Sequence, residues 1–204
     1  MSAPTPVGPP EVAFQSRVFA QVHTPNQVGD QVVVFEMAVR PPGVRVIVVD
    51  RTEQLVYLTR EMRTETNGWD WRVPGGKVYN KIEPYLPLYL EHDDSGRAEA
   101  LTEKVLDSAV QEAGEELGAV LSNPVLLGRS PCGATVHWDL YFVLADLQSL
   151  RQSNNPEAGE VIEVRPVRWT EALDLVDSGE IQEERSAMWL RRTLLRLIRE
   201  VSGG

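Results

Sequence analysis

The sequence predicts an α/β fold, an α/β/α sandwich in which helices cover both faces of a mixed sheet, with an N-terminal strand extension. Runs of β-branched and apolar residues fill the first third of the chain, one segment of helical periodicity stands in the middle, and two helical segments close the chain. The length of 204 residues favours one domain with a full core. We expect a flexible tail at residues 1–10, the strand extension at 11–43 and the main domain at 44–204.

The extension is predicted to be a pair of strands. Glu11–Val22 and Gln31–Val39 carry alternating or β-branched apolar residues, and the turn-rich segment His23–Asn26 separates them. In the main domain, Val44–Val49 is apolar enough for a buried central strand, and Leu55–Leu58 follows after a polar turn. Further strands are expected at the start of Trp69–Gly76 and at Val125–Leu127, Thr135–Leu147 and Val161–Trp169.

Helices are predicted in the middle and at the end of the chain. Arg97–Leu117 has apolar residues at helical spacing, and Gly118 ends it. The apolar residues of that stripe are Leu106, Val110, Ala113 and Leu117. The closing helices are expected at Glu171–Asp177 and Glu183–Val201.

Composition excludes several classes of protein. The formal net charge of -10 would repel a phosphate backbone, so we expect no polymeric nucleic acid as a partner. No apolar stretch approaches the roughly 20 residues that span a bilayer, so we expect no membrane insertion. Cys132 is the only cysteine, and the first ten residues do not resemble a secretory signal, so the expected compartment is the reducing cytoplasm.

Three carboxylates gather on one face of the central helix. Glu112, Glu115 and Glu116 project within about 100° of one another, and the apolar stripe lies on another side. Like charges at this spacing destabilise a helix slightly unless a cation sits on them. Hard oxygen ligands suit Mg²⁺ or Mn²⁺. A solvated acidic face is the alternative interpretation of these three residues alone.

The wider window favours a metal site. It reads Gln111-Glu112-Ala113-Gly114-Glu115-Glu116-Leu117-Gly118-Ala119 and closely resembles the core of the Nudix box, R-E-U-x-E-E-x-G-U with U apolar. Glu103 stands where the box places its first glutamate, and the turn Pro74-Gly75-Gly76 resembles the glycine that opens the box. The sequence therefore resembles the Nudix hydrolase family, which implies a Nudix-type fold and divalent-metal-dependent cleavage of a diphosphate.

The sequence departs from the box in two places. Residues 77–102 separate Gly76 from Glu103 where the box has five residues, so the loop carries an insertion at about 77–97. This insertion is either a substrate lid or a surface excursion, and we favour the surface excursion. The second departure is Gln111, which replaces an arginine that in the family holds a box glutamate in position. Glutamine can donate a hydrogen bond but carries no charge.

The resemblance implies a set of site residues. The metal ligands would be the Gly76 carbonyl and the carboxylates of Glu112, Glu115 and Glu116, with Glu103 nearby. A catalytic base would come from the box or from a downstream loop, where the candidates are Glu157 and Glu160, although each taken singly also fits a solvated loop residue. Arg60 and Arg72 are candidates for contact with phosphate, as is Arg45, and the sequence does not choose among these arginines. Pro131 lies in a segment that resembles the one after the box in the ADP-ribose pyrophosphatase group.

Substrate and partners are implied only by the regions that flank the box. They resemble the ADP-ribose pyrophosphatase group but equally fit enzymes that act on GDP-mannose or other nucleotide sugars. The expected reaction yields a nucleoside monophosphate and a phosphorylated partner. Dinucleoside polyphosphate hydrolysis, a nucleotide-binding module without turnover and a protein-interaction scaffold are alternatives. Members of the group often pair through their N-terminal strands, so a homodimer is expected here unless those strands pack on their own domain.

Overall fold

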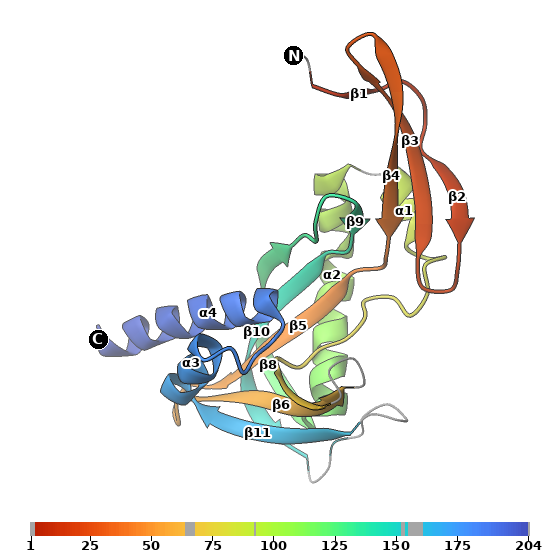
Figure 1. Cartoon of the computed structure of the whole chain (residues 1–204). Helices are drawn as coiled ribbons and strands as arrows, with labels where there is room; N and C mark the ends of the chain where they lie inside the picture. The colour runs from red at the N-terminus through yellow and green to blue at the C-terminus, as the bar shows by residue number, and fades with distance from the viewer. Residues whose placement is uncertain (1–2, 64–67, 92, 152–153, 155–160, 204) are drawn as a thin grey trace. The chain divides into compact units, whose positions relative to one another are not determined.

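The computed structural model describes residues 3–63, 68–91, 93–151, 154 and 161–203 (Figure 1). These residues form two compact units. The first unit comprises residues 1–43, 77–103 and 129–140, and the second comprises residues 44–76, 104–128 and 141–204. The first unit thus contains the expected strand extension together with most of the insertion.

A six-stranded sheet forms the middle layer of the second unit. Its strand order is β11-β6-β5-β10-β8, and β7 pairs with β6. Strand β6 is antiparallel to β5, β7 and β11. The strands are β5 (Gly43–Asp50), β6 (Leu55–Arg63), β7 (Gly68–Arg72), β8 (Ala119–Ser130), β10 (Leu140–Leu150) and β11 (Ile162–Arg168).

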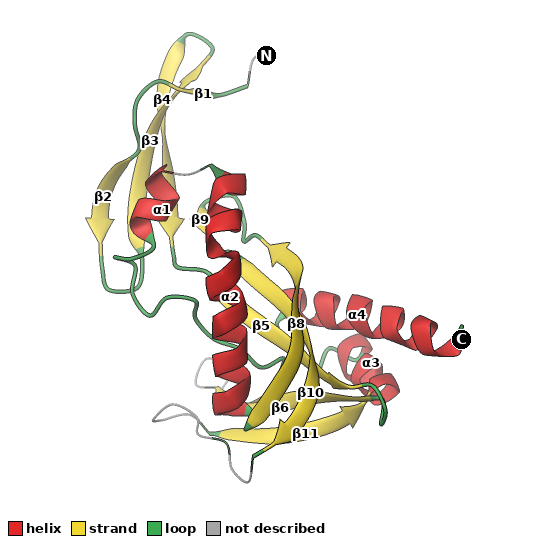
Figure 2. Cartoon of the chain, turned by 180° about the vertical axis from the view of Figure 1, so that it is seen from behind, coloured by secondary structure: helices red, strands yellow, loops and turns green. Residues whose placement is uncertain are grey.

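Helices cover both faces of this sheet. Helix α2 (Asp94–Glu116) lies on one face, and α3 (Trp169–Asp177) and α4 (Glu184–Ser202) lie on the other, as Figures 1 and 2 show from opposite sides. The core between the sheet and α3 and α4 is apolar, and Trp169 is buried in it with its indole N–H donating to the Leu55 carbonyl at 3.0 Å. Its fully buried members include Ile47, Val49, Leu58, Leu190 and Leu194. The predicted α/β/α sandwich is confirmed.

The first unit contains a separate mixed sheet. Its order is β1-β3-β4-β9 with β2 on β3, and β9 runs parallel to β4. Its strands are β1 (Thr5–Pro6), β2 (Glu11–Gln15), β3 (Ala20–Val28), β4 (Gln31–Val39) and β9 (Val136–His137). Because β1 pairs with β3, Thr5 and Pro6 belong to the sheet rather than to a flexible tail.

The predicted turn at His23–Asn26 is wrong. Those residues lie inside β3, where Pro25 pairs with Val34 and its carbonyl accepts from the Val7 amide at 2.9 Å. The chain reverses instead at Gly29, whose φ of 59° suits glycine. Another reversal at Ser16 splits the predicted strand Glu11–Val22, because the Ser16 hydroxyl accepts hydrogen bonds from the Val18 and Phe19 amides.

The insertion is packed rather than loose, which corrects the favoured surface excursion. Ile82 and Tyr85 are buried in the first unit, and the Ile82 amide donates to the Arg17 carbonyl at 2.9 Å. A short helix, α1 (Leu86–Glu91), follows. The apolar side chains of the insertion therefore contribute to the core of the first unit.

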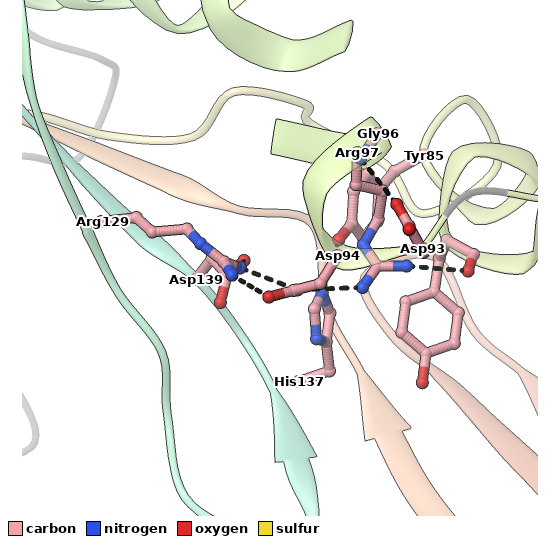
Figure 3. A network of polar contacts seen from close by, with 9 residues as sticks. Tyr85, Asp93, Asp94, Gly96, Arg97, Arg129, His137 and Asp139 are labelled. Carbon is pink, nitrogen blue, oxygen red and sulfur yellow. Dashed lines mark hydrogen bonds and ion pairs between the residues drawn. The ribbon is translucent and has the colours of Figure 1, made fainter. Parts of the chain in front are cut away.

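A charged network links the start of α2 to strand β8 and to Asp139, which directly precedes β10 (Figure 3). The Arg129 guanidinium forms ion pairs with both Asp94 and Asp139, and Arg97 also contacts Asp94, at 3.2 Å. Asp139 is only 4% exposed, so its charge depends on Arg129 for compensation. Hydrogen bonds and ion pairs with Arg129 and Arg97 lower the pKa of Asp94, although burial opposes this shift.

His137 lies beside this network between two tyrosines. The Tyr85 hydroxyl and His137 Nε2 are 2.7 Å apart, and the Tyr89 ring centroid is 4.8 Å from that of His137. Burial lowers the pKa of His137, and Arg97 and Arg129 also lower it against the opposing carboxylates of Asp139 and Asp94. His137 and Asp139 thus have contacts typical of structural residues.

Candidate active site

The turn Pro74–Gly76 connects strand β5 to the carboxylate face of α2. The Val44 amide donates to the Gly76 carbonyl at 2.9 Å, and the Val46 amide donates to the Pro74 carbonyl at 2.8 Å. On the helix side, the Gly75 amide donates to Glu116 Oε2 at 3.0 Å. The predicted turn and the last helical carboxylate are therefore in direct contact.

Both glycines of the turn make close contacts. A Cβ on Gly76 would stand 2.0 Å from Glu112 Oε1, so the carboxylate occupies the space of a side chain. A Cβ on Gly75 would stand 2.1 Å from the Val44 carbonyl oxygen, and the φ of Gly75 is +149°. The turn thus lets the carboxylates of Glu112 and Glu116 approach the backbone closely.

The carboxylates of Glu61, Glu112 and Glu116 form an acidic cluster that favours a bound cation. Glu116 is 6% exposed, and burial raises its pKa well above the usual range, with Glu61 and Glu112 raising it further. The Gly75 amide and Arg45 oppose that shift. Burial of several acidic groups without a neutralising charge is unfavourable, and a divalent cation would relieve it.

Glu61 is a member of the cluster that the sequence did not single out. It lies on β6, is 7% exposed, accepts from the Thr59 hydroxyl at 2.9 Å and forms an ion pair with Arg63. The available signal was weak: an acidic residue three positions after the apolar run Leu55–Leu58, within polar residues that continue the same strand.

The donors present fit Mg²⁺ or Mn²⁺. Glu112 and Glu116 offer carboxylate oxygens, and the Gly76 carbonyl retains one lone pair beside its bond to Val44. Within the described ranges, no three His, Cys, Asp or Glu side chains are grouped closely enough to enclose an ion by themselves. Mg²⁺ is usually held by one or two carboxylates together with waters and substrate phosphates, so two helix carboxylates suffice.

Glu115 and Glu103 have other surroundings than Glu112 and Glu116. Glu115 accepts a hydrogen bond from Gln111 Nε2 at 2.9 Å, so Gln111 retains one contact of the kind that the box arginine provides. Glu115 also lines an open cavity of about 370 Å³ with Val110 and Arg151. Glu103 is exposed on α2.

Comparison with known proteins assigns the family. The model of the NUDIX domain matches residues 39–190, about three quarters of the chain. The chain belongs to the Nudix hydrolase family. A crystal structure of an ADP compounds hydrolase has a similar fold, with a TM-score of 0.67 and 18% sequence identity over 100% of this chain and 97% of that chain. A search of curated proteins finds no match.

The other Nudix site residues expected from the sequence have different surroundings. Arg72 forms an ion pair with Asp70 at 2.7 Å, and Pro131 is exposed in the first unit. The Arg60 guanidinium carbon lies 5.5 Å from the ring centroids of both Trp69 and Trp71. The candidate bases Glu157 and Glu160 lie outside the described residues.

None of the described helices is long and apolar enough to cross a membrane.

Proposed function

We propose that this Nudix protein hydrolyses the diphosphate of a nucleoside diphosphate linked to another group, giving a nucleoside monophosphate and a phosphorylated partner. The observation that carries the proposal is the convergence of Glu112 and Glu116 on the turn Gly75–Gly76. Diphosphate cleavage needs charge neutralisation on phosphate oxygens, and this cluster is the described site best suited to hold the required cation.

The chain supplies ligands and positioning. Glu112, Glu116 and the Gly76 carbonyl would hold Mg²⁺ or Mn²⁺, and Glu115 and Glu103 are further ligand candidates on the same helix. When bound, the ion neutralises phosphate charge and lowers the pKa of an attacking water. Glu61 would keep negative charge beside Glu116, and Glu157 or Glu160 is proposed to accept the proton of the water.

ADP-ribose is the preferred substrate candidate. The similar fold of an ADP compounds hydrolase supports an adenosine diphosphate compound, and the sequence flanks support the same group. A nucleotide sugar such as GDP-mannose and a dinucleoside polyphosphate are the alternatives within hydrolysis. Gln111 is the observation that keeps a binding module without turnover as the second function.

A panel assay tests the proposal. Purified full-length protein is incubated with Mg²⁺ or Mn²⁺ and ADP-ribose, nucleotide sugars and dinucleoside polyphosphates, and phosphate release is read after phosphatase coupling. We expect cleavage of ADP-ribose that EDTA abolishes. If every substrate stays intact while calorimetry detects nucleotide binding, the binding module is correct; if neither occurs, both functions fail.

We also propose a homodimer through the first unit. Val32, Val33, Val34 and Phe35 are successive residues of β4, and each is at least 38% exposed, so both faces of the hairpin expose apolar side chains. Apolar patches of this kind on a soluble chain typically mark an interface. A second copy offers a matching apolar surface, and most soluble oligomers pair by such two-fold symmetry.

A further inference from the structure

Arg45 is a cation beside the carboxylate cluster with few partners of its own. Its Nη1 donates to the Val44 carbonyl at 3.2 Å, and its Nε is buried without an acceptor in the part of the chain that the structure describes. Within the described ranges, no carboxylate lies at ion-pair distance from it. A guanidinium has five N–H donors, so most of those of Arg45 remain available to a ligand.

The backbone places Arg45 at the turn that carries the site. Strand β5 pairs with the turn on both sides of Arg45, through the amides of Val44 and Val46. Gly75 lies directly opposite, since a Cβ on Gly75 would stand 2.9 Å from the Arg45 Cα. The amide of Gly75 also donates to Glu116, so Gly75 contacts both Arg45 and the proposed metal ligand Glu116.

The surroundings of Arg45 explain why its charge persists there. Burial lowers its pKa, and Glu116 is the charged neighbour that opposes this most, with Glu183 and Glu61 adding to the opposition. Arginine stays protonated in proteins at neutral pH. A half-buried, ionised guanidinium next to carboxylates, yet bonded to none of them, is poised for an anion that binds together with a metal.

The other arginines of this region have charged or aromatic partners, although the Nε atoms of Arg60 and Arg63, like that of Arg45, are buried without an acceptor among the described residues. Arg72 is paired with Asp70, Arg63 is paired with Glu61, and Arg60 stacks with two tryptophans. The contacts therefore separate arginines that the sequence alone could not rank.

We propose that Arg45 binds a phosphate oxygen of the substrate's diphosphate and so positions it on the Glu112 and Glu116 site. This inference rests on the proposed function. The planar guanidinium suits a phosphate because two N–H groups can bind two of its oxygens at once.

Binding without turnover tests the assignment. Calorimetry with Mg²⁺ present measures the affinity of ADP and of adenosine for the full chain and for the variants Arg45→Gln and Arg45→Lys. We expect Arg45→Gln to weaken ADP binding by about 10- to 100-fold, as for loss of a hydrogen bond to a charged group, and to leave adenosine binding unchanged. Arg45→Lys keeps the charge but loses the paired N–H groups, so its ADP affinity should lie between those of the wild type and Arg45→Gln.

Arg51→Gln is the matched control. Arg51 follows the same strand, is exposed and pairs with Asp146 at 2.7 Å, so its loss should leave ADP affinity unchanged. Unchanged ADP binding by Arg45→Gln, or an equal loss of ADP and adenosine binding, overturns the inference. If Arg45→Gln does not fold, Arg45→Lys decides by the same criterion.

The wild-type chain is assayed for ADP-ribose cleavage in parallel. Arg45-dependent ADP binding without cleavage would refute the proposed hydrolysis and leave the phosphate contact intact. Cleavage with Arg45-independent ADP binding would refute the phosphate contact alone.

Discussion

The three box glutamates have unequal positions. Glu112 and Glu116 stand four residues apart, about one helical turn, so both reach the turn at Gly75 and Gly76. Glu115 projects about 100° from Glu116 and binds Gln111 instead. The difference in their contacts is therefore a consequence of helical geometry.

Amide substitutions test this inequality. We expect Glu112→Gln and Glu116→Gln each to lower kcat for ADP-ribose by about two orders of magnitude or more, because lost ligand charge is not replaced. Glu115→Gln should have a smaller effect, since its partner is a neutral side chain. Steady-state kinetics with circular dichroism as a folding check measures this, and an equal loss in all three variants contradicts it.

Gly76 tests the close approach of the helix to the turn. A methyl group in Gly76→Ala would displace the Glu112 carboxylate, so we expect Mn²⁺ affinity to fall by about 10-fold. Gly133→Ala is the control, because a Cβ there meets nothing within 4 Å. Calorimetric Mn²⁺ titration of both variants decides; equal affinities would show that Glu112 adjusts without cost.

The sequence predicted residues of the site that share a local pattern. Glu112, Glu116 and the glycines lie in short motifs with fixed spacing, so a single window of sequence contains their signal. Glu61 was missed because only the folding of β6 against α2 brings it to Glu116. Arg45 could not be ranked from sequence because only the folded chain shows that no carboxylate of the described residues pairs with it.

At the scale of elements, Arg129 connects the start of α2 to the chain before β10. Asp139 is buried and Asp94 is exposed, although Arg129 pairs with both. The two ion pairs therefore contribute differently to the free energy of unfolding, because water screens the exposed pair.

Substitution of the network measures that difference. Arg129→Met leaves the Asp139 charge buried, so we expect it to lower the free energy of unfolding by up to about 3 kcal/mol. Asp94→Asn should cost less than about 1 kcal/mol because the side chain is largely exposed. Urea denaturation of both variants gives the values, and equal costs would contradict a leading role for Asp139.

His137 should make the first unit sensitive to acid. Its pKa is lowered in the folded chain, so the unfolded chain binds a proton first as pH falls. Stability is complete above the unfolded pKa of about 6.5 and decreases as pH falls toward the folded pKa. We expect His137→Gln to lose less stability than wild type between about pH 7.5 and pH 5.5 in urea denaturation. Parallel losses in both proteins would show that other groups are responsible.

Elements with strong periodicity were predicted best. Val44–Val49 forms as expected because a strand buried on both faces is a continuous apolar run. The central and closing helices form close to the expected residues because a buried helical face gives a periodic pattern, although Val110 of the predicted stripe is 43% exposed. The turn at His23–Asn26 failed because Pro25 can sit in a strand where its missing N–H is not needed, and Gly29 supplied the reversal. Helix α1 was missed because six residues give too short a pattern.

At the scale of the whole molecule, the apolar hairpin β3–β4 predicts self-association. Val34→Asp places a charge on the exposed β4 surface, so we expect the dimer to dissociate at micromolar concentration. Val201→Asp is the matched control, because Val34 and Val201 are each 51% exposed but Val201 lies on α4. Light scattering after size exclusion gives the mass, and a monomeric wild type would refute the dimer.

The single cysteine makes the chain convenient for spectroscopy. Cys132 is exposed and stands three residues after Arg129, so a thiol-reactive spin label attaches at one place without any engineered substitution. The mobility of that label would report on the Asp94–Arg129–Asp139 network in real time. Acidification or nucleotide addition would then be visible as a change in line shape, independent of catalysis.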